Sequence, residues 1–387
     1  VMIKNISTYA LISLVSSTIL FLTTIYLTRL LTPIEFAFIG IFSAILYLLN
    51  PLIQFNSIDL VGINVLRLSN KEYQNFINKY ISFSAWISLF TFFIILLIML
   101  FFIEYRSLIF LTFFVSITTI LITIHSIELI QNKIIKNFAL YRISLALVNL
   151  VFVFLFVDML NMSWEGRLYG LILSNILVIF LMKRMSFKSL NCFKYDIDYD
   201  YIKEHVNFGW PLMVGLGAAW GITQLDKFIV VNFFDMNSLG YYSLGYMIGM
   251  SFVVINQALV QSLMPKIYLF LESGVGRREI YKYAYLYNIF ILIAVLFVML
   301  IMYNFSGIIL GEVYRDSLDI ILLVMIAVAF DGMYRVYGLI INFYKENILR
   351  TKIEYTIMII NILISIFLIP YYGILAPAMG TITAYLL

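Results

Sequence analysis

The stretch FGWPLMVGLGAAWGITQLDKFIVVNFFDMNSLGYYSLGYMI, residues 208–248, holds the two features from which the fold can be predicted. Its apolar runs are long enough to cross about 30 Å of hydrocarbon as helices. Inside one of these runs stand two adjacent charges, Asp226 and Lys227. Each charge costs about 2.5–3.5 kcal/mol at a bilayer centre on the insertion scale, so a retained pair needs a specific purpose.

The same apolar character extends along the whole chain. Of its 387 residues, 63% are hydrophobic and only 12% are charged, and the mean hydropathy is +1.00. A soluble protein of this length needs more polar surface to cover its core. We therefore expect an all-α polytopic membrane protein with about twelve transmembrane helices. The predicted spans are 6–28, 36–58, 80–103, 107–130, 139–158, 168–184, 206–232, 240–264, 284–304, 318–342, 353–370 and 374–387.

The ends of the chain and its single cysteine add three expectations. The first span is too long for a cleaved signal peptide, and no small-residue cleavage site follows it. The last span reaches Leu387 without a polar flank, so we expect this last helix to be truncated. Cys192 is the only cysteine, which excludes an intramolecular disulfide and a cysteine-built metal site. We predict neither a cofactor nor a bound metal.

Basic residues indicate the orientation in the membrane. Nineteen of the 25 Lys and Arg residues fall in the connections on the side of the N-terminus, against four on the other side. Those four are Arg29, Arg106, Arg167 and Arg315. By the positive-inside rule, both termini are predicted to be cytoplasmic. The net charge of +4 is then a topology signal, and we expect no nucleic-acid partner.

An internal repeat predicts the domain organisation. Residues 31–45, LTPIEFAFIGIFSAI, and residues 234–248, FDMNSLGYYSLGYMI, occupy equivalent places 203 residues apart, and Gln54 falls on Gln257 at the same offset. Six spans separate the copies, so the halves share one orientation, a plan that recurs among secondary transporters. We predict two pseudo-symmetric six-helix bundles, residues 1–185 and 206–387, joined by a cytoplasmic linker at 186–205.

Residues 208–248 also carry a family resemblance, through the Pro after Phe-Gly, the Asp-Lys pair and the Gly-Tyr-Tyr that enters the next span. The segment resembles the polysaccharide-transport branch of the multidrug/oligosaccharidyl-lipid/polysaccharide (MOP) exporter superfamily, and bacterial O-antigen (Wzx-type) flippases most of all. The resemblance implies a MATE-like fold in the bacterial inner membrane and no enzymatic activity. It also implies transport of undecaprenyl-pyrophosphate-linked oligosaccharide repeat units by alternating access. Membrane lipids and the polysaccharide polymerase and chain-length machinery are the partners it suggests.

For such a substrate, intramembrane charges and amides are the candidate binding groups. Lys227 would attract the pyrophosphate, and Asp226 would hold its helix in the bundle or serve as a protonatable partner. Neighbouring residues on a helix point about 100° apart, so each of these two charges needs its own partner or water. The alternative for Lys227 is that it snorkels to the outer interface. Gln54 and Gln257 could line a sugar path or bond across helices as packing contacts.

Three further sets of charged residues have two interpretations each. Asp331 and Arg335 lie four residues apart on one helix face, where they can form a structural ion pair or contact the substrate. His125 and Glu128 could couple transport to protons or form an interfacial hydrogen-bonded pair. Arg29 ends a span, as an interface anchor or as a phosphate contact.

Two other function classes stay open. One is a cation-coupled multidrug exporter of the same superfamily. The other is a membrane-embedded polysaccharide polymerase or glycosyltransferase, for which DIDYD at 196–200 offers an Asp-x-Asp like that of metal-nucleotide sites. That motif stands in a short linker without a nucleotide-binding domain. No long outer loop, P-loop, His-Glu-x-x-His or Gly-x-Ser-x-Gly is present.

Overall fold

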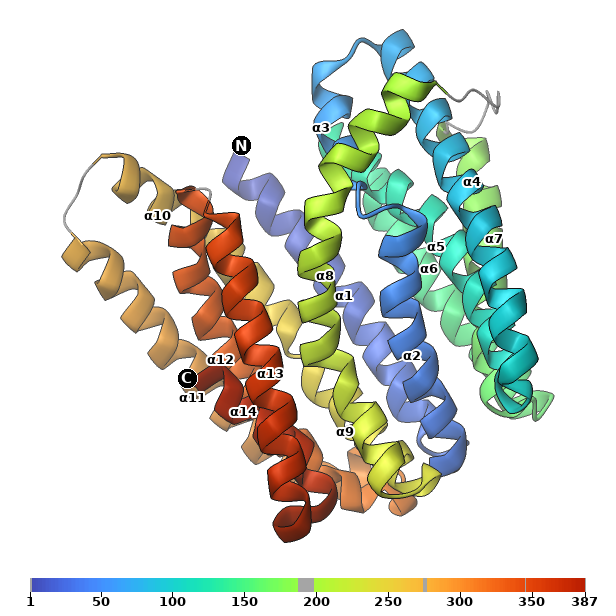
Figure 1. Cartoon of the computed structure of the whole chain (residues 1–387), viewed down its shortest axis with the longest axis vertical. Helices are drawn as coiled ribbons and strands as arrows, with labels where there is room; N and C mark the ends of the chain where they lie inside the picture. The colour runs from blue at the N-terminus through green and yellow to red at the C-terminus, as the bar shows by residue number, and fades with distance from the viewer. Residues whose placement is uncertain (1, 187–197, 274–276, 345, 387) are drawn as a thin grey trace. The chain divides into compact units, whose positions relative to one another are not determined.

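The computed structural model describes residues 2–186, 198–273, 277–344 and 346–386 (Figure 1). These residues form helices and turns throughout. The long helices are α1 (Met2–Leu27), α2 (Pro33–Ile53), α4 (Asn70–Phe101), α5 (Arg106–Gln131), α6 (Ile135–Val153), α7 (Ser163–Ser186), α8 (Tyr199–Phe233), α9 (Met236–Met250), α10 (Val253–Glu272), α11 (Arg277–Ile309), α12 (Leu318–Phe343), α13 (Asn347–Tyr372) and α14 (Ala376–Leu386). The shorter elements are α3 (Asp59–Arg67), the 3-10 turns η1 (Ile103–Tyr105), η4 (Glu312–Ser317) and η5 (Gly373–Leu375), and a π-helical segment η2 (Phe154–Met159).

The helices confirm the prediction of a polytopic membrane protein. Within the described residues, ten helical ranges are long and apolar enough to cross a bilayer, and Leu11–Leu27 of α1 adds a shorter apolar helix. The last of the ten ranges contains both α13 and α14. Each of the twelve predicted spans therefore overlaps at least one helix. A helix pairs its backbone N–H and C=O groups within the segment, so it can cross hydrocarbon, where no water is available to pair them.

Local backbone geometry departs from the prediction at two spans. The span predicted at 36–58 ends at Ile53, because Phe55 and Asn56 adopt positive φ angles that terminate the helix. The span predicted at 240–264 is divided between α9 and α10 by a turn at residues 251–252. Within the predicted linker, 186–205, α8 begins at Tyr199, and residues 187–197 lie outside the described part.

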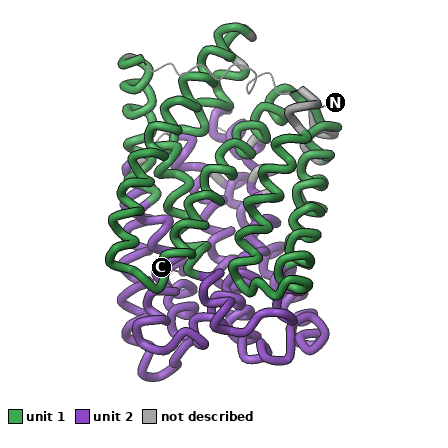
Figure 2. The backbone as a smooth tube through the Cα atoms, turned by 90° about the vertical axis from the view of Figure 1, so that its right-hand side faces the viewer, with its two compact units in different colours: residues 1–23, 41–216 green, residues 24–40, 217–387 purple. Residues whose placement is uncertain are grey.

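The chain divides into two compact units, which Figure 2 shows in different colours. The first comprises residues 1–23 and 41–216, and the second comprises residues 24–40 and 217–387. The boundaries fall inside α1, α2 and α8, so residues 24–40 pack with the second half of the chain. The division into bundles at 1–185 and 206–387 stays a prediction based on the repeat.

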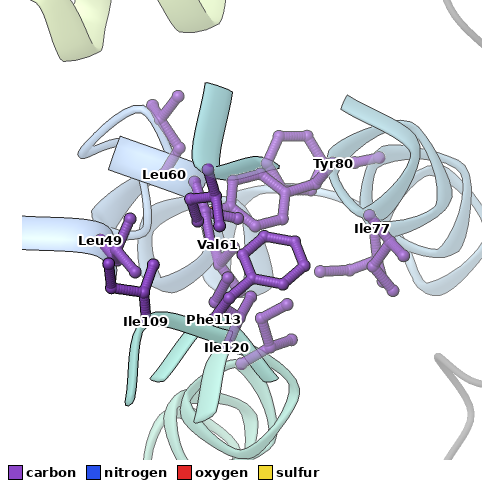
Figure 3. Packing of buried hydrophobic residues seen from close by; sticks show 13 residues of the cluster. Leu49, Leu60, Val61, Ile77, Tyr80, Ile109, Phe113 and Ile120 are labelled. Atoms are coloured by element: carbon purple, nitrogen blue, oxygen red, sulfur yellow. The ribbon is translucent and has the colours of Figure 1, made fainter. Parts of the chain in front are cut away.

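The first unit has a core of aliphatic and aromatic side chains. Figure 3 shows this cluster, in which residues from α2, α3, α4 and α5 point toward one another. Tyr80, Val61 and Ile77 are completely buried there. The short helix α3, which lies between two predicted spans, is held by this packing through Leu60 and Val61.

The second unit is assembled around α12, which contacts α9, α10, α11 and α14. Figure 1 shows α12, α13 and α14 side by side. Gly245 and Gly249 of α9 lie one turn apart and face Ile320 and Val324 of α12, where an added Cβ would meet those side chains at 2.7 Å. Small residues of this kind let helix backbones approach closely in membranes.

Candidate functional site

The two charges of α8 lie in the interior of the second unit. Asp226 is 1% exposed and Lys227 is 5% exposed, although both stand in a membrane-spanning helix. A buried ionised group is costly unless it is hydrogen-bonded, so the partners of each charge determine what it can do.

Asp226 is held by three neutral donors from three other helices. Its Oδ2 accepts hydrogen bonds from the hydroxyls of Tyr242 in α9, at 2.9 Å, and Thr381 in α14, at 3.0 Å. Its Oδ1 accepts one from the Asn361 side-chain amide of α13, at 3.3 Å. Ser365 extends the network by donating to Asn361 Oδ1 at 3.0 Å. The carboxylate therefore ties α8 to α9, α13 and α14.

Lys227 has different partners. Its Nζ donates to Gln224 Oε1 at 2.7 Å and to the backbone carbonyl of Gly40 in α2 at 3.3 Å. It also lies 5.5 Å from the ring centre of Tyr246 in α9, within the range of a cation–π contact. These partners lie inside the unit, so in this structure Lys227 does not snorkel to the interface.

Asp331 and Arg335 of α12 form the ion pair that their spacing allows. Arg335 Nε lies 2.6 Å from Asp331 Oδ2. The carboxylate is buried, whereas 38% of the Arg335 side chain is exposed. Asn256 of α10 and Tyr287 of α11 converge on neighbouring Gly332, where both would touch an added Cβ.

His125 and Glu128 lie together in the first unit. His125 Nδ1 is 3.8 Å from Glu128 Oε2, and the hydroxyl of Tyr73 in α4 donates to Glu128 Oε1 at 2.9 Å. The His125 ring meets that of Tyr141 edge-on. Both side chains of the pair are largely buried, so the structure joins them into one cluster with Tyr73.

The remaining candidates occupy separate places. Gln54 is buried in the turn that follows α2, whereas Gln257 is exposed on α10. Although the repeat aligns them, their local structures therefore differ. Arg29 is exposed beyond the end of α1, and its Nη2 donates to the carbonyl of Ile308 at 3.0 Å. It lines a small cavity of about 350 Å³ together with Gly311 and Glu312.

The structure adds three residues that sequence reasoning missed, namely Tyr242, Asn361 and Thr381. Asn361 stands in the apolar run 357–364 of α13, and that position was the available signal, whereas Tyr242 in α9 and Thr381 in α14 have polar neighbours and gave none. With Asp226 they supply oxygen and amide groups only. No cluster of three or more His, Cys, Asp or Glu residues that could hold a metal occurs among the described residues.

Comparison with known proteins gives one family and one fold. A family model described as "Polysaccharide biosynthesis protein" matches residues 26–319. No curated protein matches the sequence closely enough to count as a relative.

Among solved structures, an inward-facing multidrug resistance MATE family transporter of the MOP superfamily matches with a TM-score of 0.70 and 12% identity, covering 97% of this chain and 96% of that one. The outward-facing conformation of such a transporter gives a TM-score of 0.61 and 14% identity, with coverages of 99% and 92%. The MATE multidrug transporter DinF-BH, solved as a complex, gives 0.67 and 15%, with coverages of 99% and 93%. These likenesses show the fold.

Proposed function

The chain belongs to the polysaccharide biosynthesis protein family and has the fold of MATE transporters, and on that premise we propose that it is a flippase for lipid-linked oligosaccharides. The cargo would be an undecaprenyl-pyrophosphate-linked repeat unit of O-antigen or a similar surface polysaccharide. The protein would carry it across the bacterial inner membrane by alternating access, with both termini in the cytoplasm. The observation that carries this proposal is the family match, which covers most of the chain on a transporter fold.

The chemistry of the buried site supports a substrate that has an anionic head group. Lys227 places a positive charge within the membrane-spanning part of α8, and the acceptors named above, Gln224 and the Gly40 carbonyl, are neutral. A diphosphate is a stronger partner for an ammonium than a neutral amide oxygen, because a hydrogen bond in which both groups are charged is the stronger one. We assign Lys227 to the pyrophosphate and Asp226 to the positioning of α8.

The other candidate residues take supporting roles in this proposal. Arg335, held by Asp331, and Arg29 supply further positive charge along the path. Gln54 and Gln257 supply hydrogen bonds to sugars. His125 and Glu128 serve as the proton-coupling pair. Contacts with the polymerase and chain-length machinery would follow from this place in polysaccharide assembly.

The two alternatives have less support. The solved multidrug transporters share the fold at 12–15% identity, whereas the family match points to polysaccharide, so a cation-coupled drug exporter is the second candidate. A transporter fold also argues against a polymerase or glycosyltransferase. Within the DIDYD segment, Asp198 forms an ion pair with Lys79 at 3.2 Å, and residues 196–197 lie outside the described part.

Rescue of surface polysaccharide in a flippase-deficient bacterium tests the proposal. We expect the parent protein and Lys227→Arg to restore it, because both carry the charge, and Lys227→Ala to fail at equal membrane abundance. Lys136→Ala, at an exposed lysine of α6, is the matched control and should behave as the parent. Full rescue by Lys227→Ala would show that Lys227 does not bind the pyrophosphate of the substrate. A parent protein that restores no polysaccharide but confers drug efflux would favour the exporter.

A further inference from the structure

Residues 24–40 are joined to the rest of the second unit by a row of contacts, which we call the outer seam. The Gly311 N–H donates to Thr28 Oγ1 at 3.0 Å, and the Tyr314 hydroxyl donates to the Leu31 carbonyl at 2.9 Å. The buried ring of Phe36 packs edge-on against that of Tyr314, with 5.2 Å between ring centres. The seam lies at the membrane side where Arg29 and Arg315 are predicted to be external.

Close backbone approaches make the seam tight. Gly240 of α9 faces the Pro33 carbonyl, and an added Cβ at Gly240 would overlap that oxygen. Gly40 faces the side chain of Ser243 in the same way. Gly40 and Ser243 occupy equivalent positions of the repeat, 203 residues apart, so their contact lies where the two copies meet. Two repeat copies in contact at equivalent residues form a junction that a rocking motion would have to separate.

The bond from Lys227 to Gly40 is a polar contact of this row that lies within the membrane-spanning helices. Lys227 stands six residues before the end of α8, and Gly40 stands seven residues after the start of α2. At 1.5 Å per residue, both lie about 10 Å below the ends of their helices. A head group that approaches the seam from inside the protein can therefore meet the Lys227 ammonium within the membrane-spanning part of α8.

The two ends of that bond respond differently to its loss. The Gly40 carbonyl belongs to a helix, where the N–H four residues later supplies its ordinary partner, so release costs it little. The Lys227 ammonium would be left as a buried charge with one fewer partner, which is strongly unfavourable. The bond should therefore persist until another acceptor takes the place of the carbonyl.

From this asymmetry we propose that Lys227 is the sensor that links substrate binding to the opening of the outer seam. An anionic diphosphate replaces the Gly40 carbonyl as hydrogen-bond acceptor of the Lys227 ammonium. Residues 24–40 then separate from α9. Asp226 keeps α8 bound to α13 and α14 meanwhile, because none of its three hydrogen bonds goes to residues 24–40. The inference rests on the proposed function, since it requires a diphosphate-bearing substrate.

Ser243 offers a reporter for the seam. Its side chain is 2% exposed against Gly40, and its hydroxyl has no hydrogen-bond partner among the described residues, so Ser243→Cys removes no hydrogen bond there. In a Cys192→Ser background it is the only thiol of the chain. The purified protein in detergent is treated with a maleimide, and the labelling rate is measured with undecaprenyl diphosphate, with undecaprenol, or without lipid. Binding of each lipid is measured separately by thermal stabilisation.

We expect undecaprenyl diphosphate to raise the labelling rate about tenfold and undecaprenol to leave it unchanged. Lys227→Met, which removes the bond without leaving a buried charge, should label rapidly without lipid and show no further response. Lys266→Met, at an exposed lysine of α10, should respond as the parent does. A Lys227→Met variant that responds to the diphosphate like the parent would overturn the sensor. A parent that binds the diphosphate without faster labelling would also overturn the sensor, but not the proposed function. A parent that does not bind the diphosphate would overturn both.

Discussion

Replacement of Asp226 tests whether this carboxylate holds the second unit together. Asp226→Leu removes the acceptor of three interhelical hydrogen bonds and leaves the donors of Tyr242, Asn361 and Thr381 buried. Hydrogen bonds between membrane helices average about 0.6 kcal/mol, so the three together stabilise the fold by about 2 kcal/mol. Asp226→Asn keeps one carbonyl oxygen in place and should lose less than half of that.

The assay is reversible unfolding of the purified protein in mixed micelles by a denaturing detergent, followed by tryptophan fluorescence. Thr381→Val removes one of the three bonds and should cost about 0.6 kcal/mol, while Asp59→Asn, at an exposed carboxylate of α3, serves as the control. The loss of stability should follow the number of hydrogen bonds removed. It should be largest for Asp226→Leu, smaller for Asp226→Asn and Thr381→Val, and smallest for the control. An Asp226→Leu variant as stable as the parent would show that the network contributes nothing to the stability of the fold. That result would also refute the positioning role of Asp226.

Three further outcomes follow from the other contacts. Arg335→Met should lower the yield of folded protein in size-exclusion chromatography, and adding Asp331→Leu should restore it, because a single buried charge is the costly state; equal yields for the single and double variants would contradict this. Glu128→Gln should abolish the dependence of transport on a proton gradient while Tyr73→Phe, which leaves the carboxyl group, retains it; a Gln variant that still responds to the gradient would exclude the coupling role. Gly240→Ala should raise the basal labelling of the seam reporter, because its methyl group would overlap a carbonyl of α2; unchanged labelling would mean that the seam is not tightly closed.

The sequence was sufficient for the parts of the fold that depend on local physics. Each span needs about twenty apolar residues, and this requirement is visible in the sequence without any tertiary contact. The ion pair of Asp331 and Arg335 was equally accessible, because four residues in a helix bring two side chains onto one face. Apolar runs alone did not reveal where a span breaks. The turn after Ile53 depends on the positive φ angles of Phe55 and Asn56, which the length of the apolar run did not indicate.

The partners of the buried charges could not be predicted in this way. Asn361 lies 135 residues and Thr381 lies 155 residues from Asp226, and the Gly40 carbonyl lies 187 residues from Lys227. Such contacts arise from the packing of helices that no local pattern pairs. The sequence did show that Asp226 and Lys227 need separate partners, because adjacent residues of a helix face different directions.

Movement of a diphosphate-linked glycan across a bilayer is the activity on which these proposals depend. The most direct measurement uses proteoliposomes that contain an undecaprenyl-diphosphate oligosaccharide with a fluorescent sugar, and follows the fraction that an impermeant quencher can reach. We expect the parent to transfer the labelled lipid between leaflets without nucleotide, Lys227→Arg to retain most of this transfer, and Lys227→Ala to transfer no faster than protein-free vesicles. Transfer by the parent at the protein-free rate, under imposed proton, sodium and voltage gradients alike, would contradict the proposed function.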